Sequence, residues 1–432
     1  MKTKDAHAKE YPMRLLYLTC TELVVDYGIF DTQVKSLLKA LVERYRDEFE
    51  VHLYSFVPML RFTKKSFMEI VFQRYRQSFR ELRKEMSAAG IQASVRPLLS
   101  AYPFDTWRWL EMLVALPGAT AMLFLYVRRH RIEVLHCRSY HAGLLGLIIN
   151  RTAGKPYIFD PRSLWIEEQI LDGKWPRTSW TCRLWKKLEA AIVRHAAACV
   201  VVSDPMQASF AAQAKRIEVI YTTAGEMHFD ALIDTAMPEA TQALERLPDA
   251  QVLFVFNAGN FNRWNNLDHL LKRFSELCRI VPRAALVIIT RTPREHIEKK
   301  LPLYAISKDR VVIMALVSAL VPVVLRKCDY GLLVRPRSSE SPREISVKLP
   351  EYLAAGLPVI SDEYIGGAAA VIEHHRVGVL LADDWNKNEA ALARLQASYQ
   401  TVSKRCLKVA REWFSVHVHA EKYASLYQEA RA

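Results

Sequence analysis

Short apolar runs alternate with longer amphipathic stretches along almost the whole 432-residue chain, and this alternation restricts the fold more than any single motif does. Runs of strand length in the first half lie at residues 15–19, 51–56, 94–98, 134–136, 157–160, 199–203 and 218–221. Stretches with a helical period lie between them, at residues 33–46, 65–88, 109–129, 143–151 and 185–195. Strands separated by helices pair in parallel through right-handed crossovers, so the pattern predicts an α/β fold with a parallel sheet.

A second series of the same kind follows a polar, weakly patterned stretch at residues 230–250. Its expected strands lie at residues 252–256, 285–290, 311–314, 330–334, 358–361 and 379–381, and a helical tail covers residues 389–432. The chain is long enough for two domains with separate cores, so we expect two doubly wound, Rossmann-like domains. Ligands bind at the carboxyl ends of the strands in such sheets, which predicts a site in a cleft between the two domains.

The chain carries a strong positive charge, with 60 Lys and Arg residues against 46 Asp and Glu residues and a net charge of +14. Such a surface attracts nucleic acids, anionic lipids or phosphorylated small molecules. Glycine is scarce at 14 residues, and the sequence contains no GxGxxG, GxxxxGKS or GxxxxGKT motif, which argues against glycine-rich phosphate loops. Hydrophobic residues at 51% and charged residues at 25% exclude a mainly disordered or fibrous chain.

The cysteines and the apolar stretches indicate where the protein resides. The seven cysteines form no CxxC pair, so we expect buried free thiols in a reducing compartment. The first ten residues have no apolar core, and we expect no signal peptide. The apolar stretches at residues 112–127 and 311–325 are too short to span a bilayer and contain Pro117 and Pro322, so we expect buried elements there.

The most informative stretch is residues 346–360, which is expected to form a loop, a helix that begins near Val347, a stop at Gly356 and a strand. The free N–H groups of the first helical turn favour an anion, and Lys348 and Ser346 add a positive charge and a hydroxyl there. Glu351 adds a hydrogen-bond acceptor to the same turn. A diphosphate next to a ribose would use all these groups, whereas the ordinary alternative is a capped helix with a surface lysine.

Residues 348–360, Lys-Leu-Pro-Glu-Tyr-Leu-Ala-Ala-Gly-Leu-Pro-Val-Ile, resemble the donor-binding helix of GT-B glycosyltransferases, specifically the large retaining family 4 group, also called glycosyl transferases group 1. The resemblance continues in order at residues 134–144, 159–168, 200–206, 219–225 and 256–263, and around Trp413. It implies a GT-B fold, in which two Rossmann-like doubly wound domains face a cleft. The implied parts are an acceptor-side domain (1–235), a nucleotide-sugar-binding domain (236–412) and a helix that packs back on the first domain (413–432).

The resemblance implies a retaining glycosyltransferase that moves a sugar from a nucleotide-diphosphate sugar to a saccharide or lipid-linked saccharide, as in bacterial surface polysaccharide synthesis. Lys348, Ser346 and Arg263 would bind the donor diphosphate, and Glu351 would bind the ribose hydroxyls. His141, expected at a helix start after a strand, would hydrogen-bond a donor hydroxyl or the acceptor, unless it is a structural histidine. His141 and Glu351 are the expected catalytic residues, and neither a metal nor another cofactor is expected.

The chain departs from the pattern of this group at the donor motif. The first of two usual glutamates, eight positions before Glu351, is replaced by Arg343, and Glu344 lies one position away. The usual basic pair after the first strand of the second domain corresponds to Asn260 and Asn265. These departures leave open a catalytically inert GT-B protein that binds a partner transferase or a glycan, whereas no carboxylate pair supports a nucleotide-sugar epimerase.

Three residues of the first half complete the cleft candidates. Gly28 is what remains of the glycine pair usual in the group. Asp160 and Arg162 belong to an Asp-x-Arg segment that resembles one common in bacterial members. The two residues either form an ion pair with each other that has a structural role, or they line the acceptor side of the cleft.

Basic and aromatic residues mix in the segment from Arg61 to Arg80. Such a segment is either a solvated helix face above a core stripe or a surface that docks on an anionic membrane. No helix-turn-helix, zinc-finger or RNP signature accompanies it, so no nucleic-acid partner is expected. We therefore expect a cytoplasmic protein with a peripheral contact to anionic lipid on the inner face of the cytoplasmic membrane.

Overall fold

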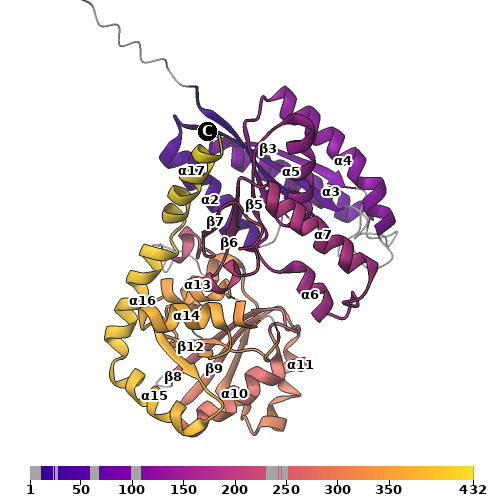
Figure 1. Cartoon of the computed structure of the whole chain (residues 1–432). Coiled ribbons are helices and arrows are strands. Elements are labelled where there is room, and N and C mark those ends of the chain that lie inside the picture. The colour runs from indigo at the N-terminus through magenta and orange to yellow at the C-terminus, as the bar shows by residue number, and fades with distance from the viewer. Residues whose placement is uncertain are drawn as a thin grey trace, which may run out of the picture. The chain divides into compact units, whose positions relative to one another are not determined.

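A computed structural model of the chain shows the expected alternation of strands and helices (Figure 1). It describes residues 11–22, 24, 28–58, 68–98, 109–229, 242, 245, 252–339, 341–343 and 345–431, without the side chains of residues 58, 68–75 and 109–114. The chain folds into two units, and each is described by itself. The first unit comprises the chain up to Val201, residues 207–220 and the C-terminal stretch from Ala420, and the second comprises residues 202–206 and 221–419.

The first unit is built on a sheet of seven parallel strands in the order β3-β2-β1-β4-β5-β6-β7. The strands are β1 (Met13–Cys20), β2 (Phe49–Pro58), β3 (Gln92–Leu98), β4 (Val134–Arg138), β5 (Tyr157–Asp160), β6 (Ala198–Val201) and β7 (Ile217–Val219). The inner strand β1 is buried at every residue except the half-buried Arg14, as expected for a parallel sheet covered on both faces.

Helices connect the strands of this unit. They are α1 (Gly28–Phe30), α2 (Ser36–Tyr45), α3 (Met68–Ala88), α4 (Trp109–Arg129), α5 (Tyr140–Ala153), α6 (Trp165–Leu171) and α7 (Trp180–His195). The short helix α8 (Asp204–Gln207) belongs to the second unit except for its last residue. A π-helical turn at Asp31–Lys35 joins α1 to α2. Within the described residues, every helix is too short or too polar to cross a lipid bilayer.

The second unit is built on a sheet of six parallel strands in the order β10-β9-β8-β11-β12-β13. The strands are β8 (Val252–Gly259), β9 (Ala284–Thr290), β10 (Val311–Met314), β11 (Tyr330–Leu333), β12 (Val359–Asp362) and β13 (Gly378–Leu381). The helices are α10 (Leu267–Ile280), α11 (Arg294–Glu298), α12 (Val321–Leu325), α13 (Lys348–Ala354), α14 (Gly366–His375), α15 (Trp385–Ala397) and α16 (Tyr399–Trp413).

The last helix, α17 (Val416–Arg431), carries the chain from the second unit into the first, to which its residues from Ala420 onward belong. Its buried tyrosines attach it there, because the Tyr427 hydroxyl lies 2.8 Å from Nδ1 of the buried His136. Lys422 adds a hydrogen bond of 3.3 Å from its ammonium to the carbonyl of Val219. The C-terminal helix thus returns to the first unit, as the family resemblance implied.

The structure confirms the predicted fold class of two doubly wound parallel α/β units. Every apolar run that was assigned to a strand forms one, with ends that differ by at most a few residues. All seven cysteines are unpaired, and six of them are buried, which agrees with the expected free thiols.

Candidate functional site

The short helix α13 presents the donor-motif residues at the carboxyl ends of β8 and β11 in the second unit. Leu349, Tyr352 and Leu353 are fully buried and anchor the helix on the sheet. The Tyr352 ring packs over Gly331 of β11, where an added Cβ would lie 2.4 Å from the ring. The Tyr352 hydroxyl accepts a hydrogen bond of 3.0 Å from the Asn257 amide at the end of β8. Core packing therefore fixes the first turn of α13 beside the end of β8.

Lys348, in the first turn of α13, is buried, with an exposed fraction of 8%. Its Nζ donates to Oδ1 of Asn265 at 2.6 Å and lies 4.4 Å from the centroid of the Phe256 ring. Burial, together with repulsion from Arg335, lowers the pKa of Lys348 to about 7, although Glu351 opposes the shift. Asn265, which occupies the position of the second basic residue in the pattern of glycosyl transferases group 1, thus accepts a hydrogen bond from the Lys348 ammonium.

Arg335 is a residue of this site that the sequence prediction missed. It follows β11, and Asp362 at the end of β12 accepts a hydrogen bond of 3.0 Å from its backbone N–H. Its carbonyl accepts a hydrogen bond of 2.6 Å from the Tyr364 hydroxyl, which fixes the backbone on both sides. The position directly after a buried apolar strand was the available signal, because carboxyl ends of parallel strands carry ligand sites.

Glu351 lies one turn from Lys348 and is half-buried. Its Oε2 accepts a hydrogen bond of 3.1 Å from Nδ2 of Asn257. Burial raises the pKa of Glu351 to about 7, against the opposing effects of Lys348 and the hydrogen bond from Asn257. Near neutral pH both Glu351 and Lys348 therefore exchange protons easily, which is common at functional sites.

The remaining donor-side candidates lie around this turn. Ser346 is buried, and its Oγ accepts a hydrogen bond of 3.3 Å from the Lys348 amide at the start of α13. Arg343 is half-buried, and its carbonyl accepts a hydrogen bond of 2.8 Å from the Ser203 hydroxyl. Arg263 is exposed in the turn after β8, with its guanidinium 5.6 Å from the Trp264 ring centroid. Glu344 lies outside the described residues.

The carboxyl edge of the first unit carries unusual backbone at three adjacent strands. Thr21, Ser139 and Arg162 follow β1, β4 and β5, and their φ angles are +69°, +73° and +64°. Ser139 also has a ψ of 169°, a combination that is essentially restricted to glycine. Such strain concentrates at functional sites, and the sequence shows no sign of it because none of the three is a glycine.

Unpartnered buried polar atoms lie at the same edge. Within the described part of the chain, Nη1 of Arg138 and Oγ of Ser139 are buried without a hydrogen-bond partner. The rest of the Arg138 guanidinium is held by Glu22, with 3.0 Å between Nε and Oε2. Buried polar groups almost always have a partner in native proteins, so these two atoms are candidates for contact with a ligand.

His141 lies in the first turn of α5, directly after this edge. Its ring packs against Trp165 and Trp185, with centroid distances of 5.0 and 5.2 Å, and Nδ1 lies 3.4 Å from the Thr21 hydroxyl. Its exposed fraction is 9%, and burial lowers the pKa of His141 to about 3. The imidazole is therefore neutral at physiological pH, where it can donate or accept a hydrogen bond.

Asp160 and Arg162 form the couple that the sequence analysis gave as one alternative. Arg162 Nη1 lies 3.3 Å from Oδ2 of the fully buried Asp160, and its Nη2 donates to Gln33 at 3.2 Å. Burial would raise the pKa of Asp160, but Arg162 and the ring of His136 lower it to about 2. The other candidate, Gly28, is half-buried at the start of α1.

Comparison with known proteins places the chain in a family. Residues 32–223 match the sequence model of the "Glycosyl transferase 4-like domain", and residues 252–398 match that of "Glycosyl transferases group 1". A search of curated proteins gives no significant match.

Solved structures share the fold over almost the whole chain. HepE of Anabaena, solved in complex with UDP, is 16% identical with a TM-score of 0.63, covering 96% of this chain and 99% of that one. Sucrose-phosphate synthase of Thermosynechococcus elongatus is 15% identical with a TM-score of 0.66, covering 96% and 98%. WaaG, a glycosyltransferase involved in lipopolysaccharide biosynthesis, is 10% identical with a TM-score of 0.59, covering 96% and 99%. Together, the two family matches and the shared architecture show that the chain belongs to the glycosyl transferases group 1 family and has the GT-B fold.

Proposed function

We propose that this glycosyltransferase moves a hexosyl group from a nucleotide-diphosphate sugar to a saccharide or lipid-linked saccharide, with retention at the anomeric carbon. The observation that carries the proposal is the buried ammonium of Lys348, whose pKa is lowered by burial and by the nearby charge of Arg335. A ligand with two negative charges would offset the repulsion between two neighbouring cations, and a diphosphate is such a ligand.

The leaving diphosphate would be stabilised by the positive charges of Arg335 and of Lys348, which the bound diphosphate keeps protonated, with Ser346 and Arg263 at the border of the site. Preorganised charge of this kind is usually the largest contribution to catalysis. Because these side chains supply the positive charge, we propose that the donor binds without a metal ion. Glu351, oriented by Asn257, would accept hydrogen bonds from the ribose hydroxyls.

The acceptor would bind at the strained edge of the first unit. Nη1 of Arg138 and Oγ of Ser139 offer buried polar atoms to the hydroxyls of a saccharide. The neutral ring of His141, beside the Thr21 hydroxyl, would position a hydroxyl group of the acceptor or the donor sugar. Asp160 and Arg162 would hold this edge in place through their mutual ion pair.

The relatives support a narrower proposal about the pathway. HepE was solved with UDP, and WaaG takes part in lipopolysaccharide biosynthesis. We infer that this chain acts in the synthesis of a bacterial surface polysaccharide, in the cytoplasm and peripherally at the inner face of the membrane. Residues 61–67 of the basic segment predicted to contact lipid lie outside the described residues, and the rest of the segment, up to Arg80, belongs to α3.

Ligand binding and turnover test the proposal. Thermal-shift measurements with UDP, GDP, ADP and CMP should identify one nucleotide that stabilises the protein. A ligand at 100 times its dissociation constant should add about 2.7 kcal/mol to the free energy of unfolding. With the matching nucleotide sugar, the protein should release nucleoside diphosphate, faster when acceptor is present. If none of the four nucleotides stabilises the protein, the proposal is contradicted.

The alternative is a catalytically inert protein of the same fold that binds a partner transferase or a glycan. The observation that favours it is Arg343, which stands where the group usually has the first donor-site glutamate. Donor hydrolysis in the absence of acceptor separates the two functions. A protein that binds the nucleotide but releases no sugar over long incubation would support the alternative.

A further inference from the structure

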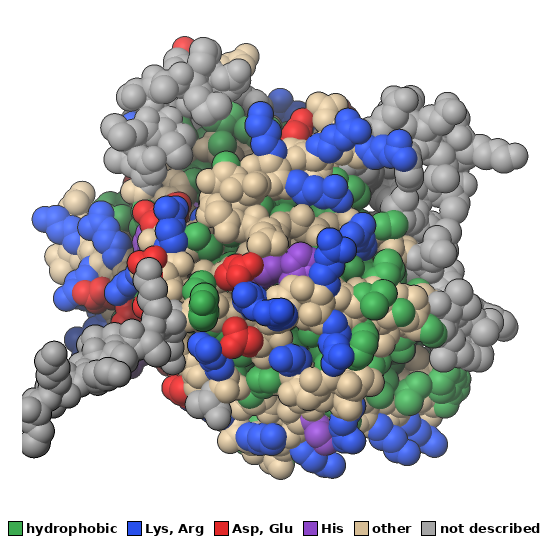
Figure 2. Space-filling model, turned by 90° about the horizontal axis from the view of Figure 1, so that it is seen from above, with side chains coloured by type: hydrophobic (Ala, Val, Ile, Leu, Met, Phe, Trp, Pro, Cys, Tyr) green, Lys and Arg blue, Asp and Glu red, His purple; other side chains and the backbone are tan. Residues whose placement is uncertain are grey.

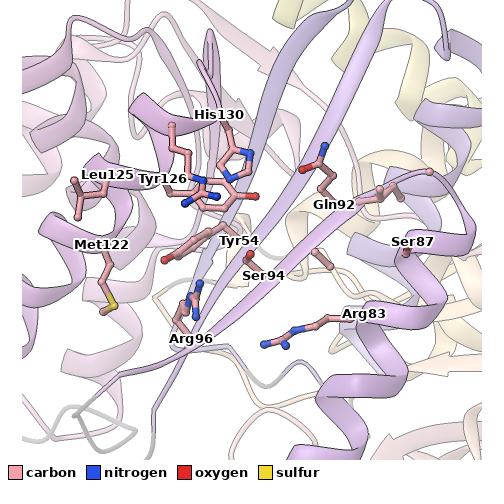
Figure 3. A pocket seen from close by; sticks show the side chains of 14 residues that line it. Tyr54, Arg83, Ser87, Gln92, Ser94, Arg96, Met122, Leu125, Tyr126 and His130 are labelled. Carbon is pink, nitrogen blue, oxygen red and sulfur yellow. The ribbon is translucent and has the colours of Figure 1, made fainter.

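A pocket of about 930 Å³ lies at one edge of the first unit, away from the strand ends discussed above (Figure 3). Its floor is the edge strand β3, and its walls are the last turns of α3 and α4. Helices of a doubly wound unit run antiparallel to its strands, so the last turns of α3 and α4 lie toward the amino ends of the strands. The pocket therefore differs in place from the carboxyl edge proposed for the acceptor.

Helix α4 covers β2 but leaves one face of β3 uncovered. The side chains on this open face are polar, and they form the floor of the pocket. Gln92, Ser94 and Arg96 alternate along β3 and therefore share one face. On the neighbouring strand, Tyr54 is opposite Ser94 and is covered by Tyr126 of α4, with ring centroids 4.7 Å apart. The register thus explains why the sheet face at β3 lines a pocket.

Positive charge converges on this pocket from three elements. Arg83 of α3 and Arg96 of β3 point into the same space (Figure 3). Arg129, the last residue of α4, and His130, which follows it, also line the pocket. Among the described residues that line the pocket, none is acidic. Lys and Arg side chains also predominate over Asp and Glu side chains across the face shown in Figure 2.

Two of these arginines are held in place by the sheet. Nη2 of Arg83 donates to the carbonyl of Val95, which belongs to the edge strand, at 3.3 Å. Burial raises the pKa of Tyr54, and the nearby charge of Arg96 and a hydrogen bond from it oppose the rise, so this guanidinium lies close to the Tyr54 hydroxyl. Glu50 lies beyond the floor, where it accepts a hydrogen bond from Gln92 at 3.0 Å and pairs with Arg14 at 3.1 Å.

We propose that this pocket binds a phosphate ester, with the phosphate between Arg83, Arg96 and Arg129. Guanidinium groups match phosphate oxygens in bidentate geometry, and several of them suit a group with more than one negative charge. The volume far exceeds that of a phosphate ion and falls in the range of small-molecule sites, so the ligand has an organic part. This site is independent of the donor site proposed in the second unit.

The side chains on the α4 wall indicate where the organic part lies. Met122 and Leu125 are 39% and 66% exposed and line the pocket. Tyr126 stacks on His130 with 4.2 Å between the ring centroids, which adds an aromatic surface. Such a wall accommodates either the apolar face of a sugar ring or the glycerol and first methylenes of a lipid. A soluble phosphosugar and the headgroup of an anionic lipid are thus two sources of the same chemistry.

Binding measurements on the full chain test the proposal. Calorimetry would use glucose 6-phosphate, inorganic phosphate and glucose as probes, and sedimentation would use vesicles of phosphatidylglycerol or phosphatidylcholine. The variants are Arg96→Gln and Arg129→Gln, and Arg128→Gln is the matched control because Arg128 neighbours Arg129 on α4 but does not line the pocket. Arg96→Lys keeps the positive charge but removes the planar guanidinium that can donate two hydrogen bonds to one phosphate. Thermal unfolding of each variant shows whether it is still folded.

We expect glucose 6-phosphate or phosphatidylglycerol vesicles to bind, and the probe that binds identifies the source. Arg96→Gln and Arg129→Gln should each weaken binding about tenfold or more, the scale of one charge-assisted hydrogen bond, whereas Arg128→Gln should change it by less than about twofold. Equal loss in Arg128→Gln, or binding of neither probe, would overturn the proposal. Lys348→Ala should leave this binding intact, so failure here is distinguishable from failure of the donor site.

Discussion

At the scale of single residues, the account depends most on Lys348. Its ammonium is assigned to the donor phosphates, so Lys348→Ala should weaken the binding of a nucleoside diphosphate by about tenfold or more while leaving nucleoside binding nearly unchanged. Titration calorimetry with both ligands measures the difference. Lys299→Ala, at an exposed position of the same unit, is the control and should affect neither ligand. Equal losses for nucleoside and nucleoside diphosphate would contradict the phosphate assignment.

The shifted pKa values of Lys348 and Glu351, both about 7, predict how proton exchange accompanies donor binding. At pH 8 the free Lys348 amine is mostly neutral, and the diphosphate favours its charged form, so binding should take up a proton. At pH 6 the free Glu351 is mostly protonated, and ribose hydroxyls favour its carboxylate, so binding should release one. Calorimetry of a nucleotide sugar in buffers of different ionisation enthalpy measures this. Binding without proton exchange at both pH values would contradict the assignment.

Ser139 tests whether the carboxyl edge of the first unit is strained. Ser139→Gly should raise the free energy of unfolding by about 1 kcal/mol. The backbone conformation of Ser139 costs about 1–3 kcal/mol in a non-glycine residue, and the greater loss of chain entropy on folding a glycine offsets part of the gain. Urea denaturation measures the change. Arg376→Gly, at an ordinary left-handed position with φ +52° and ψ +47°, should gain less. A loss of stability in Ser139→Gly would mean that the conformation is not strained.

The sequence revealed some of these residues and concealed others for physical reasons. Lys348, Ser346 and Glu351 share one helical turn, so a local motif was enough to find them. Arg335 joins them only because β11 lies beside β8 in the sheet, and no local pattern reports that neighbour. The strain at Ser139 was equally hidden, because a serine carries no signal for a conformation that glycine normally occupies.

At the scale of elements, the contact of α13 with β11 positions the donor motif. Gly331→Ala would place a Cβ 2.4 Å from the Tyr352 ring, so it should lower the free energy of unfolding by about 1–3 kcal/mol through overpacking. It should also weaken nucleotide binding, because Tyr352 holds the end of β8 through Asn257. Denaturation and calorimetry measure both effects.

Gly118→Ala is the matched control for this change. An added Cβ at Gly118 of α4 meets no atom within 4 Å, and alanine favours a helix interior, so stability should rise by about 1 kcal/mol. Two changes of the same kind should thus act in opposite directions. An unchanged stability in Gly331→Ala would show that α13 is not held by this contact.

Strands were predicted better than helix ends. The apolar runs of β1 and β9 are buried along nearly their whole length, so hydrophobicity alone located them. The helix expected at residues 33–46 instead begins as α1 and continues through the π-helical turn Asp31–Lys35. In a π-helical turn each hydrogen bond spans one residue more than in an α-helix. The pattern of hydrophobic residues in the sequence does not reveal this difference.

At the scale of the whole molecule, crossover rules predicted parallel pairing of the strands but not their order, and the return of α17 to the first unit was expected from the family resemblance. Tyr427 and Tyr423 of α17 contact His136 and Asp160, which lie 291 and 263 positions earlier in the chain. Two aromatic side chains in a helical tail do not by themselves indicate which sheet they contact. The predicted domain limits at residues 235 and 412 stay predictions.

The central claim is that the second unit binds the diphosphate of a nucleotide sugar at Lys348 and Arg335. A crystal structure with the nucleoside diphosphate that stabilises the protein most tests this directly. We predict diphosphate oxygens within hydrogen-bonding distance of the Lys348 ammonium and the Arg335 guanidinium, with the ribose hydroxyls on Glu351. A diphosphate bound in contact with none of these three side chains would contradict the account.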